Sequence, residues 1–381
     1  ASWRAPGSFG AHQLRRQGAF NEEMEKRLEA VQAAARDAVA SVTKIIKEAD
    51  SQQLKIAIGS ASAAVVVAVA LYRRASKPPP PPPPPPPRKL ELTQLHSFDV
   101  PKELTIPHYF DLDAAEVRAG CPEAVGYLRG CGNVTEALDG LHGFVISQLE
   151  QRALEIDREI PEVSKSSPRK IAARKAARSR DIILAPGAKV AEGAILDASG
   201  GQIYLGQDVS VEPGALVKGP AYICEGCVVR HGAYIRGDVY LGAKTIVGGE
   251  LKHMLALDSC ELPHYGYCGD SLLGHKAHFG CGSLTANLPL LPHSKPACTL
   301  PDGNTYVLGR KKFGAIVGDR SQLGCGSVTE PGCLLAPNTC CYPLTRLARG
   351  LYGPDELLKN RPSIERVPLR PPQPGLTYQW V

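Results

Sequence analysis

The sequence has little net charge. Its 44 Lys and Arg residues only slightly outnumber its 38 Asp and Glu residues, which gives a formal net charge of +6 over 381 residues. The most basic run, residues 167–180, is short and has no interleaved aromatic side chains. Nucleic-acid-binding domains usually carry a strongly basic surface. The composition therefore argues against nucleic acid as a partner.

Motifs for a zinc site or a disulfide framework are also sparse. Among the 12 cysteines, Cys224 and Cys227 form a C-x-x-C pair, but a structural zinc site usually needs a second pair or two histidines. We therefore expect no metal there. Cys227, Cys333 and Cys341 stand where a repeat described below calls for small apolar residues, a role that a free cysteine fills well. This usage indicates a reducing compartment.

What the sequence does contain is a period of six residues between 205 and 247. Such a period fits neither an ordinary strand nor a helix, and it is typical of a solenoid whose short strands each end in a turn. The aliphatic positions are expected to point inward, and the small ones to sit near the corners. The aliphatic positions are Leu205, Val211, Val217, Ile223, Val229, Ile235, Leu241 and Val247; four residues after each stand Val209, Ala215, Ala221, Cys227, Ala233, Val239, Thr245 and Leu251.

The repeat extends beyond this stretch in both directions. It begins near Ile182, slips by three residues at 199–201, and closes near residue 345. We expect Tyr267, Leu273 and Phe279 to resume the inward positions, followed by an insertion at 286–312. The fold class predicted is therefore an all-β solenoid, a parallel β-helix of hexapeptide repeats over 182–345, in which three hexads make one triangular coil.

The segments before the repeat differ in composition. Residues 1–55 are expected to hold a flexible tail and, from Asn21, an amphipathic helix with an Ala-rich heptad seam, which could pair with a partner helix or lie on a membrane or on its own protein. Since the first residue is Ala, we expect either that a targeting peptide has been removed or that the chain is a fragment. Residues 56–72 are uncharged and flanked by basic residues. Their length is at the low end for a membrane span.

The 56–72 stretch leads us to expect a single-pass membrane location, in a plastid thylakoid or mitochondrial inner membrane. Residues 73–104 form a basic and proline-rich linker, in which the ten prolines 78–87 predict a polyproline II spacer. A helical segment is expected over 105–181. The tail 346–381 is rich in proline.

Two stretches carry a resemblance to a known family. Glu250-Leu-Lys-His, continued by Pro263-His-Tyr-Gly-Tyr-Cys-Gly-Asp-Ser-Leu-Leu-Gly, and then Gly309-Arg-Lys-Lys-Phe-Gly-Ala-Ile-Val-Gly-Asp, resemble the β-helix of bacterial sugar-1-phosphate nucleotidylyltransferases and the acetyltransferase half of the bifunctional N-acetylglucosamine-1-phosphate uridylyltransferase. The resemblance covers about 105–345 and implies a left-handed coil. The family's nucleotide-binding domain has no counterpart before residue 105, so nucleotidyl transfer is not expected.

The resemblance also implies site residues. His264 matches the family's catalytic base, which takes the proton of an attacking amine. Lys252 and Arg230 match phosphate-binding residues, Tyr267 a substrate-contacting Tyr, and Asn287 an Asn near the catalytic His. Packing alone is an alternative explanation for Tyr267, and a plain surface position for His264. The sequence departs from the family at His278, where an Asn is usual, and after Asn287, where Leu-Pro-Leu follows.

Three functions follow from these observations. The first is a membrane-anchored acyltransferase that forms trimers and moves an acetyl group from acetyl-CoA to an amino-sugar phosphate, with no metal. The second is a non-catalytic accessory subunit of an organellar membrane complex. The third is a γ-type carbonic anhydrase. The pair His275 and His278 faintly resembles the zinc ligands of that family, whose zinc hydroxide chemistry needs converging His ligands.

Overall fold

The computed structural model of the chain describes residues 86–159, 181–291 and 293–361, together with Ala33, Asp37 and Ala40. These last three residues are helical, within the helix predicted from Asn21. The chain divides into two units, residues 1–85 and residues 86–381. The basic run 167–180, the C-terminal part of the predicted tail and the N-terminal part of the proline run lie outside the described residues.

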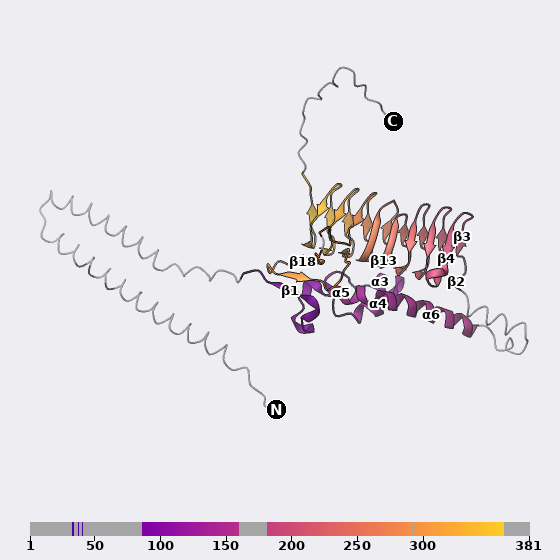
Figure 1. Ribbon diagram of the computed structural model, residues 1–381, viewed down its shortest axis with the longest axis horizontal. Coiled ribbons are helices and arrows are strands. Elements are labelled where there is room, and N and C mark those ends of the chain that lie inside the picture. Colours follow the sequence, from indigo (N-terminus) through magenta and orange to yellow (C-terminus); the bar gives the residue numbers. More distant parts are fainter. Residues whose placement is uncertain are drawn as a thin grey trace, which may run out of the picture. The chain divides into compact units, whose positions relative to one another are not determined.

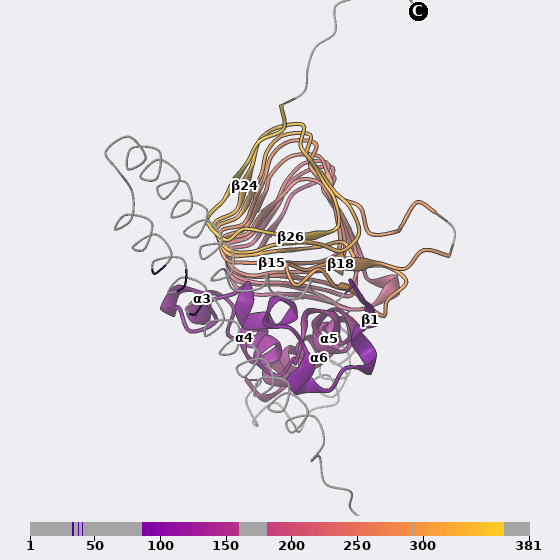
Figure 2. The same cartoon turned by 90° about the vertical axis from the view of Figure 1, so that its left-hand side faces the viewer.

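A parallel β-helix makes up the larger part of the second unit, which confirms the predicted solenoid (Figure 1). Seen end-on, its coils stack into a triangular prism (Figure 2). Each coil contributes one short strand to each of three faces, and each strand pairs in parallel with the equivalent strand of the next coil. The long strands β13 (Glu250–Ala256) and β15 (Tyr267–Leu273) bend around the edge between two faces and join them into one sheet.

We name the three faces by their strands. The covered face holds the C-terminal halves of β13 and β15 with β2 (Ile182–Leu184), β5 (Ile203–Leu205), β8 (Ala221–Ile223), β11 (Val239–Leu241), β20 (Ala315–Val317), β23 (Cys333–Leu335) and β26 (Gly350–Tyr352). The second face holds the N-terminal halves of β13 and β15 with β4 (Ile195–Asp197), β7 (Leu216–Lys218), β10 (Tyr234–Arg236), β17 (Leu284–Thr285), β22 (Val328–Thr329) and β25 (Arg346–Leu347). The third face holds β3 (Lys189–Val190), β6 (Ser210–Val211), β9 (Val228–Val229), β12 (Ile246–Val247), β14 (Glu261–Leu262), β16 (His278–Phe279), β21 (Gln322–Leu323), β24 (Cys340–Cys341) and β27 (Leu357–Leu358).

The inward positions predicted for residues 205–251 are confirmed. All eight aliphatic side chains at the sixfold positions, and all eight small ones four residues later, are at most 1% exposed. Together they line the interior of the prism. The prediction is weaker at the first coil, where Leu184 is 50% exposed and Val190 is 37% exposed, because no coil stacks beneath them.

The predicted phase is wrong at Tyr267. Cys268, not Tyr267, aligns with the inward residue Leu251 of the preceding coil, while Tyr267 aligns with Glu250 on the outside of the second face. Leu251 itself aligns with the inward residue Ile235, so it fills a flat-face position and not a corner. The phase changes because β15 is one residue shorter than a regular coil at the edge between the second and covered faces. Its inward residues Cys268 and Leu273 are five residues apart, whereas the equivalent Ile235 and Leu241 are six apart.

Helices lie against the covered face (Figure 2). Four short 3-10 turns, η1 (Leu92–Gln94), η2 (Ser97–Asp99), η3 (Lys102–Leu104) and η4 (Ile106–His108), precede α3 (Ala115–Gly120), α4 (Pro122–Arg129), α5 (Val134–Asp139) and α6 (Leu141–Glu159). A further 3-10 turn, η6 (Ala198–Gly200), lies at the predicted slip in the repeat. The Asn133 side chain caps α5 by accepting hydrogen bonds from Thr135 N and Glu136 N, which satisfies two of its free amides.

An outward-facing apolar ladder explains why the helices pack where they do. On the covered face, the central residue of each strand aligns with its counterpart on the next coil. These side chains form one core with the helices; Phe144 of α6, for example, packs 5.3 Å from Tyr240 between ring centroids. The ladder is Tyr204, Tyr222, Tyr240, Leu255, Leu272, Ile316, Leu334 and Leu351.

The insertion between β17 and β20 folds as a hairpin. Strands β18 (Ala297–Thr299) and β19 (Thr305–Val307) pair antiparallel, and β1 (Lys89–Glu91) adds to β19 in parallel. The C-terminal part of the predicted linker is thus tied to the insertion about two hundred residues later, through the pairing of Lys89 with Thr305.

The predicted membrane location is corrected. None of the helices in the described part of the chain is both long enough and apolar enough to cross a membrane. The proposed anchor at 56–72 lies outside the described residues.

Candidate functional site at the short corner

One corner of the prism is shorter than its neighbours. Between the third and second faces, residues 230–233 make the turn from β9 to β10, and residues 263–266 make the turn from β14 to β15. Between them, the turn from β12 to β13 contains only Gly248 and Gly249. The two flanking corners therefore project beyond the short one, and we call this step in the prism edge the notch. Gly248 and Gly249 at its floor are buried.

Glycine is needed in the short corner because the next coil lies so close. A Cβ at Gly248 would come within 2.3 Å of Pro263 O, and one at Gly249 within 2.8 Å of Gly266 O. Separations under 3.0 Å essentially never occur for real Cβ atoms. A side chain at either position would push the two coils apart and fill the notch.

The predicted base His264 projects from the corner on one side of the notch. Its side chain is exposed, and so is that of Tyr265. Across the notch, Arg230 spans the missing residues and donates a hydrogen bond from Nη1 to Pro263 O at 2.9 Å. Arg230 and the turn that carries His264 are thus in direct contact. The structure gives the His264 ring no hydrogen bond or ion pair within the described residues.

A small cavity lies behind His264. It has a volume of about 10 Å³, which is space for roughly one water molecule. Its lining includes His264, Tyr265, Tyr267, Phe279 and Ser283. A cavity of this size has room for a water molecule beside His264 but not for an acceptor.

Tyr267 and Asn287 are brought together on the second face. Asn287 Nδ2 donates to the Tyr267 hydroxyl at 2.8 Å and to Asp270 Oδ2 at 2.7 Å. The backbone also holds Asn287, because Phe313 N donates to Asn287 O at 2.9 Å. Asn287 therefore orients Tyr267 and Asp270. No hydrogen bond joins it to His264 in the described structure.

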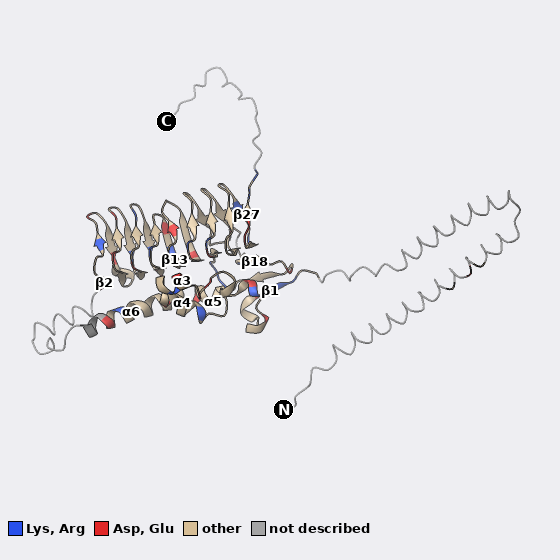
Figure 3. Cartoon of the chain, turned by 180° about the vertical axis from the view of Figure 1, so that it is seen from behind, with Lys and Arg blue, Asp and Glu red and all other residues tan. Residues whose placement is uncertain are grey.

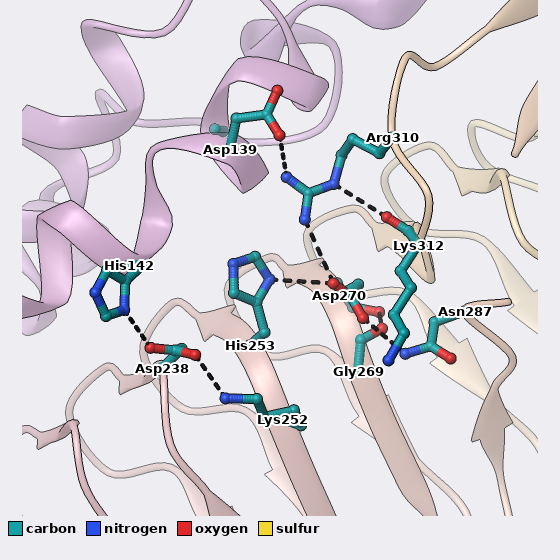
Figure 4. Close-up of polar contacts among 12 residues, drawn as sticks. Asp139, His142, Asp238, Lys252, His253, Gly269, Asp270, Asn287, Arg310 and Lys312 are labelled. Carbon is teal, nitrogen blue, oxygen red and sulfur yellow. Dashed lines mark hydrogen bonds and ion pairs between the residues drawn. The ribbon is translucent and has the colours of Figure 1, made fainter. Parts of the chain in front are cut away.

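Lys252 lies on β13, one strand away from Tyr267 along the sheet. Its Nζ is 2.5 Å from Asp238 Oδ2, and Asp238 Oδ1 is 2.5 Å from His142 Nδ1 of α6 (Figure 4). The ammonium of Lys252 is therefore already neutralised. A phosphate could bind it only in competition with Asp238.

The structure reveals a group of charged residues that the sequence analysis missed. Asp270 accepts from Asn287, lies 3.4 Å from Arg310 Nη2, and lies 3.3 Å from His253 Nδ1 (Figure 4). Arg310 also pairs with Asp139 at the end of α5. Asp270 and Arg310 both stand inside the two stretches that resemble the nucleotidylyltransferases, and that was the available signal. The participation of Asp139 and His142 had no sequence signal, because both come from helices distant in the chain.

These contacts set the charge state of the two central carboxylates. Burial alone would raise the pKa of Asp270, but the neighbouring His253, Asn287 and Arg310 outweigh it and leave the pKa below its ordinary value. The pKa of Asp238 is likewise lowered, because contacts with Lys252 and His142 outweigh its burial. Burial, with Asp270 close by, raises the pKa of Tyr267, so its hydroxyl stays protonated at neutral pH and can donate a hydrogen bond.

The charge distribution over the described part of the chain is mixed. Basic and acidic positions are interspersed along the helices and the β-helix in the view of Figure 3.

The two histidines considered as zinc ligands of a carbonic anhydrase lie in different surroundings. His275 is buried, with Nδ1 2.9 Å from Asp258 Oδ1, whereas His278 Nδ1 lies 3.1 Å from Glu261 Oε2 at the surface. In residues 86–159, 181–291 and 293–361, no three His, Cys, Asp or Glu side chains come together as metal ligands.

The comparisons with known proteins agree with the resemblance. No protein-family model matches the chain. A bifunctional protein GlmU from Methanococcus vannielii is 36% identical over 109 residues, which is 28% of this chain and 26% of that protein. A bifunctional sugar-1-phosphate nucleotidylyltransferase/acetyltransferase from Sulfurisphaera tokodaii is 28% identical over 145 residues, which is 38% of this chain and 36% of that protein. The chain thus spans about a quarter to a third of the length of these curated relatives.

A search of solved structures matched the acetyltransferase domain of PglB from Neisseria gonorrhoeae FA1090 in complex with acetyl coenzyme A. That domain is 11% identical, and the match covers 52% of this chain and 63% of that one with a TM-score of 0.12. So low a score carries no argument. Over its β-helix the chain is thus similar to the GlmU and sugar-1-phosphate nucleotidylyltransferase/acetyltransferase proteins.

Proposed function

We propose that this protein transfers an acyl group from a thioester donor, acetyl-CoA, to the amine of a small anionic acceptor such as an amino-sugar phosphate. One observation carries the proposal. The repeat is shortened at a single corner between the third and second faces in residues 205–329, and that corner opens the notch beneath His264. A regular solenoid has no need for such a defect, and this one gives an exposed imidazole a recess beside it.

In this proposal His264 is the general base. It would remove the proton of the acceptor amine as the amine attacks the thioester carbonyl, a contribution that is typically 10²- to 10⁴-fold. Arg230 has further N–H groups beyond the one that binds Pro263 O, and a guanidinium suits a phosphate oxygen. Tyr267, whose hydroxyl Asn287 orients, would contact the acceptor.

The His264 ring has no orienting partner in this chain's described residues, and a second copy would have to complete the site. We therefore extend the proposal to a trimer in which acetyl-CoA binds between neighbouring β-helices. Lys252 would contribute to the acceptor site only after leaving Asp238. The Sulfurisphaera tokodaii relative is named as an acetyltransferase, which supports the reaction class.

The test compares two histidines on the same corner of the prism. His264→Gln should lower turnover of an amino-sugar phosphate by roughly 10²-fold or more and leave acetyl-CoA binding, measured by calorimetry, unchanged. His231→Gln is the matched control, because His231 is also exposed and projects from the corner at 230–233, on the other side of the notch. Equal turnover in both variants, or no acetyl-CoA binding by the unaltered chain, would overturn the proposal.

A non-catalytic role is the second candidate, and one observation favours it. Of the five residues matched to the family, all except His264 have a hydrogen-bond or ion-pair partner within the chain. A solenoid that has lost catalytic activity would keep such contacts because they stabilise the fold. The two functions are separated by the oligomeric state and ligand binding together: a monomer by light scattering that does not bind acetyl-CoA supports the non-catalytic role.

A further inference from the structure

Two cysteines differ from the other ten in being exposed. Cys281 and Cys325 have exposed side chains, whereas the remaining cysteines are buried or half-buried, and all twelve are free thiols. Burial raises the pKa of buried thiols such as Cys227 and Cys268 to about 12, which leaves them protonated and unreactive. The two exposed thiols are the accessible ones.

The coil register places these two cysteines next to each other. On one side of the corner His278 aligns with Gln322, and on the other Leu284 aligns with Val328. The same register, continued through the turn, aligns Cys281 with Cys325. A backbone hydrogen bond of 2.8 Å from Gly326 N to Cys281 O fixes the two turns to one another.

The spacing is compatible with a covalent link between the two sulfurs. Neighbouring strands lie about 4.8 Å apart, and disulfides span Cα separations of roughly 4.4–6.8 Å. The Cys325 sulfur leans toward the coil below, because it lies only 3.0 Å from where a Cβ on Gly280 would stand. Gly282 and Gly326, with φ of +74° and +68°, follow the two cysteines, and glycine lets the turns adjust at little cost.

The same corner position one coil earlier holds His264. Glu261 aligns with His278 and Tyr267 with Leu284, so His264 and Cys281 stand in register. The hydroxyl of Tyr265 lies 3.2 Å from where a Cβ on Gly282 would be. Cys281 and Cys325 therefore lie on the coils next to the corner that carries His264. The inference below does not depend on whether the notch is catalytic.

We propose that Cys281 and Cys325 form a thiol–disulfide site that is oxidised by small-molecule disulfides. One cysteine thiolate attacks the small disulfide, which forms a mixed disulfide and releases one small thiol. The second cysteine thiolate then attacks the protein sulfur of the mixed disulfide, which forms the Cys281–Cys325 bond and releases the second small thiol. Two electrons and two protons pass from the cysteines to the small disulfide, which leaves as two thiols. An excess of small thiol reverses both steps.

The experiment treats the full chain with oxidised glutathione, blocks the remaining thiols with iodoacetamide and maps the peptides by mass spectrometry without reduction. We expect a loss of two free thiols, one linked peptide pair containing Cys281 and Cys325, and full return of both thiols with dithiothreitol. In Cys281→Ser or Cys325→Ser, the remaining cysteine should instead carry one glutathione and no internal link.

Cys340→Ser is the matched control. Cys340 is half-buried on β24 of the third face, one coil further along, and its loss should leave the linked pair unchanged. Two separate glutathione adducts on the unaltered chain, or a link joining two chains, would overturn the proposal, as would a linked peptide pair that persists in Cys325→Ser. The rate at which iodoacetamide labels each cysteine of the native chain gives a second measure. Cys281 and Cys325 should be labelled first, and oxidation should protect both from labelling.

Discussion

The covered face and the notch corner are built from the same hexad repeat but serve different ends. On the covered face the outward side chains are Tyr, Leu and Ile, and they are buried or partly buried against the helices. At the notch corner the outward side chains are His264, Tyr265 and Cys281, and they are exposed. The repeat specifies only what points inward, so each face is free to take a separate role. The predictions below test that difference, from the largest expected effect to the smallest.

Replacing a buried outward tyrosine should destabilise the fold strongly. Tyr240 is fully buried between Phe144 and Tyr222, so Tyr240→Ala should cost about 3–5 kcal/mol of unfolding free energy through lost contacts and a cavity. Tyr265→Ala, at a side chain that is 73% exposed, should change it by less than about 0.5 kcal/mol. Urea unfolding of both variants tests the contrast, and equal losses would show that the helices do not depend on the ladder.

Removing the charge of Asp270 should weaken the junction of helices, β-helix and insertion. Asp270→Asn should cost about 2 kcal/mol at pH 7, because it breaks charge-assisted contacts with Arg310 and His253. The folded-state pKa of Asp270 lies below the ordinary value of 3.8. Its ionised form therefore stabilises the fold above about pH 4, and this contribution is lost as the pH falls through the lowered folded-state value.

The check is the free energy of unfolding of Asp270→Asn and the unaltered chain at several pH values. The difference between them should shrink as the solution becomes more acidic. Glu192→Gln, at an exposed position in the first coil, should show no such dependence. A constant difference between pH 7 and pH 3 would mean that Asp270 acts through shape and not through charge.

Filling the short corner should close the notch. In Gly248→Ala the new methyl group would meet Pro263 O at 2.3 Å, and the resulting shift should cost roughly 1–3 kcal/mol, as overpacking does elsewhere. If the notch is the acceptor site, turnover should fall by more than this destabilisation explains, at a temperature where the variant is fully folded. Normal turnover in a folded Gly248→Ala protein would place the site elsewhere.

A glycine on the helical side offers the smallest effect, with the opposite sign. Gly143 lies inside α6, and a Cβ there would meet nothing within 4 Å. Gly143→Ala should therefore stabilise the chain by about 0.5–1 kcal/mol, since alanine is the better helix former. Thermal unfolding measures this change in stability. A loss of stability would indicate that another part of the chain packs closely against α6 at Gly143.

The amino-acid sequence by itself determined the solenoid and its interior. A repeat of six residues repeats one local geometry, so the inward positions from Leu205 to Val247 could be read without any long-range information. The prediction failed at Tyr267 because β15 is one residue short at the edge between two faces, which leaves its inward residues Cys268 and Leu273 five apart. A fixed period of six cannot show where a residue has been lost. Only the family resemblance identified the candidate site residues Lys252, Tyr267, Asn287, Arg230 and His264.

Only the tertiary structure decided which face the helices cover and which charges are paired. His142 reaches Asp238, Asp139 reaches Arg310, and β1 pairs with β19; each contact joins residues that are far apart in the chain. Such pairs depend on how whole elements pack, which no local pattern encodes. The register that brings Cys281 beside Cys325 depends in the same way on the insertion folding outside the coil, so that two turns separated along the chain become neighbours in space.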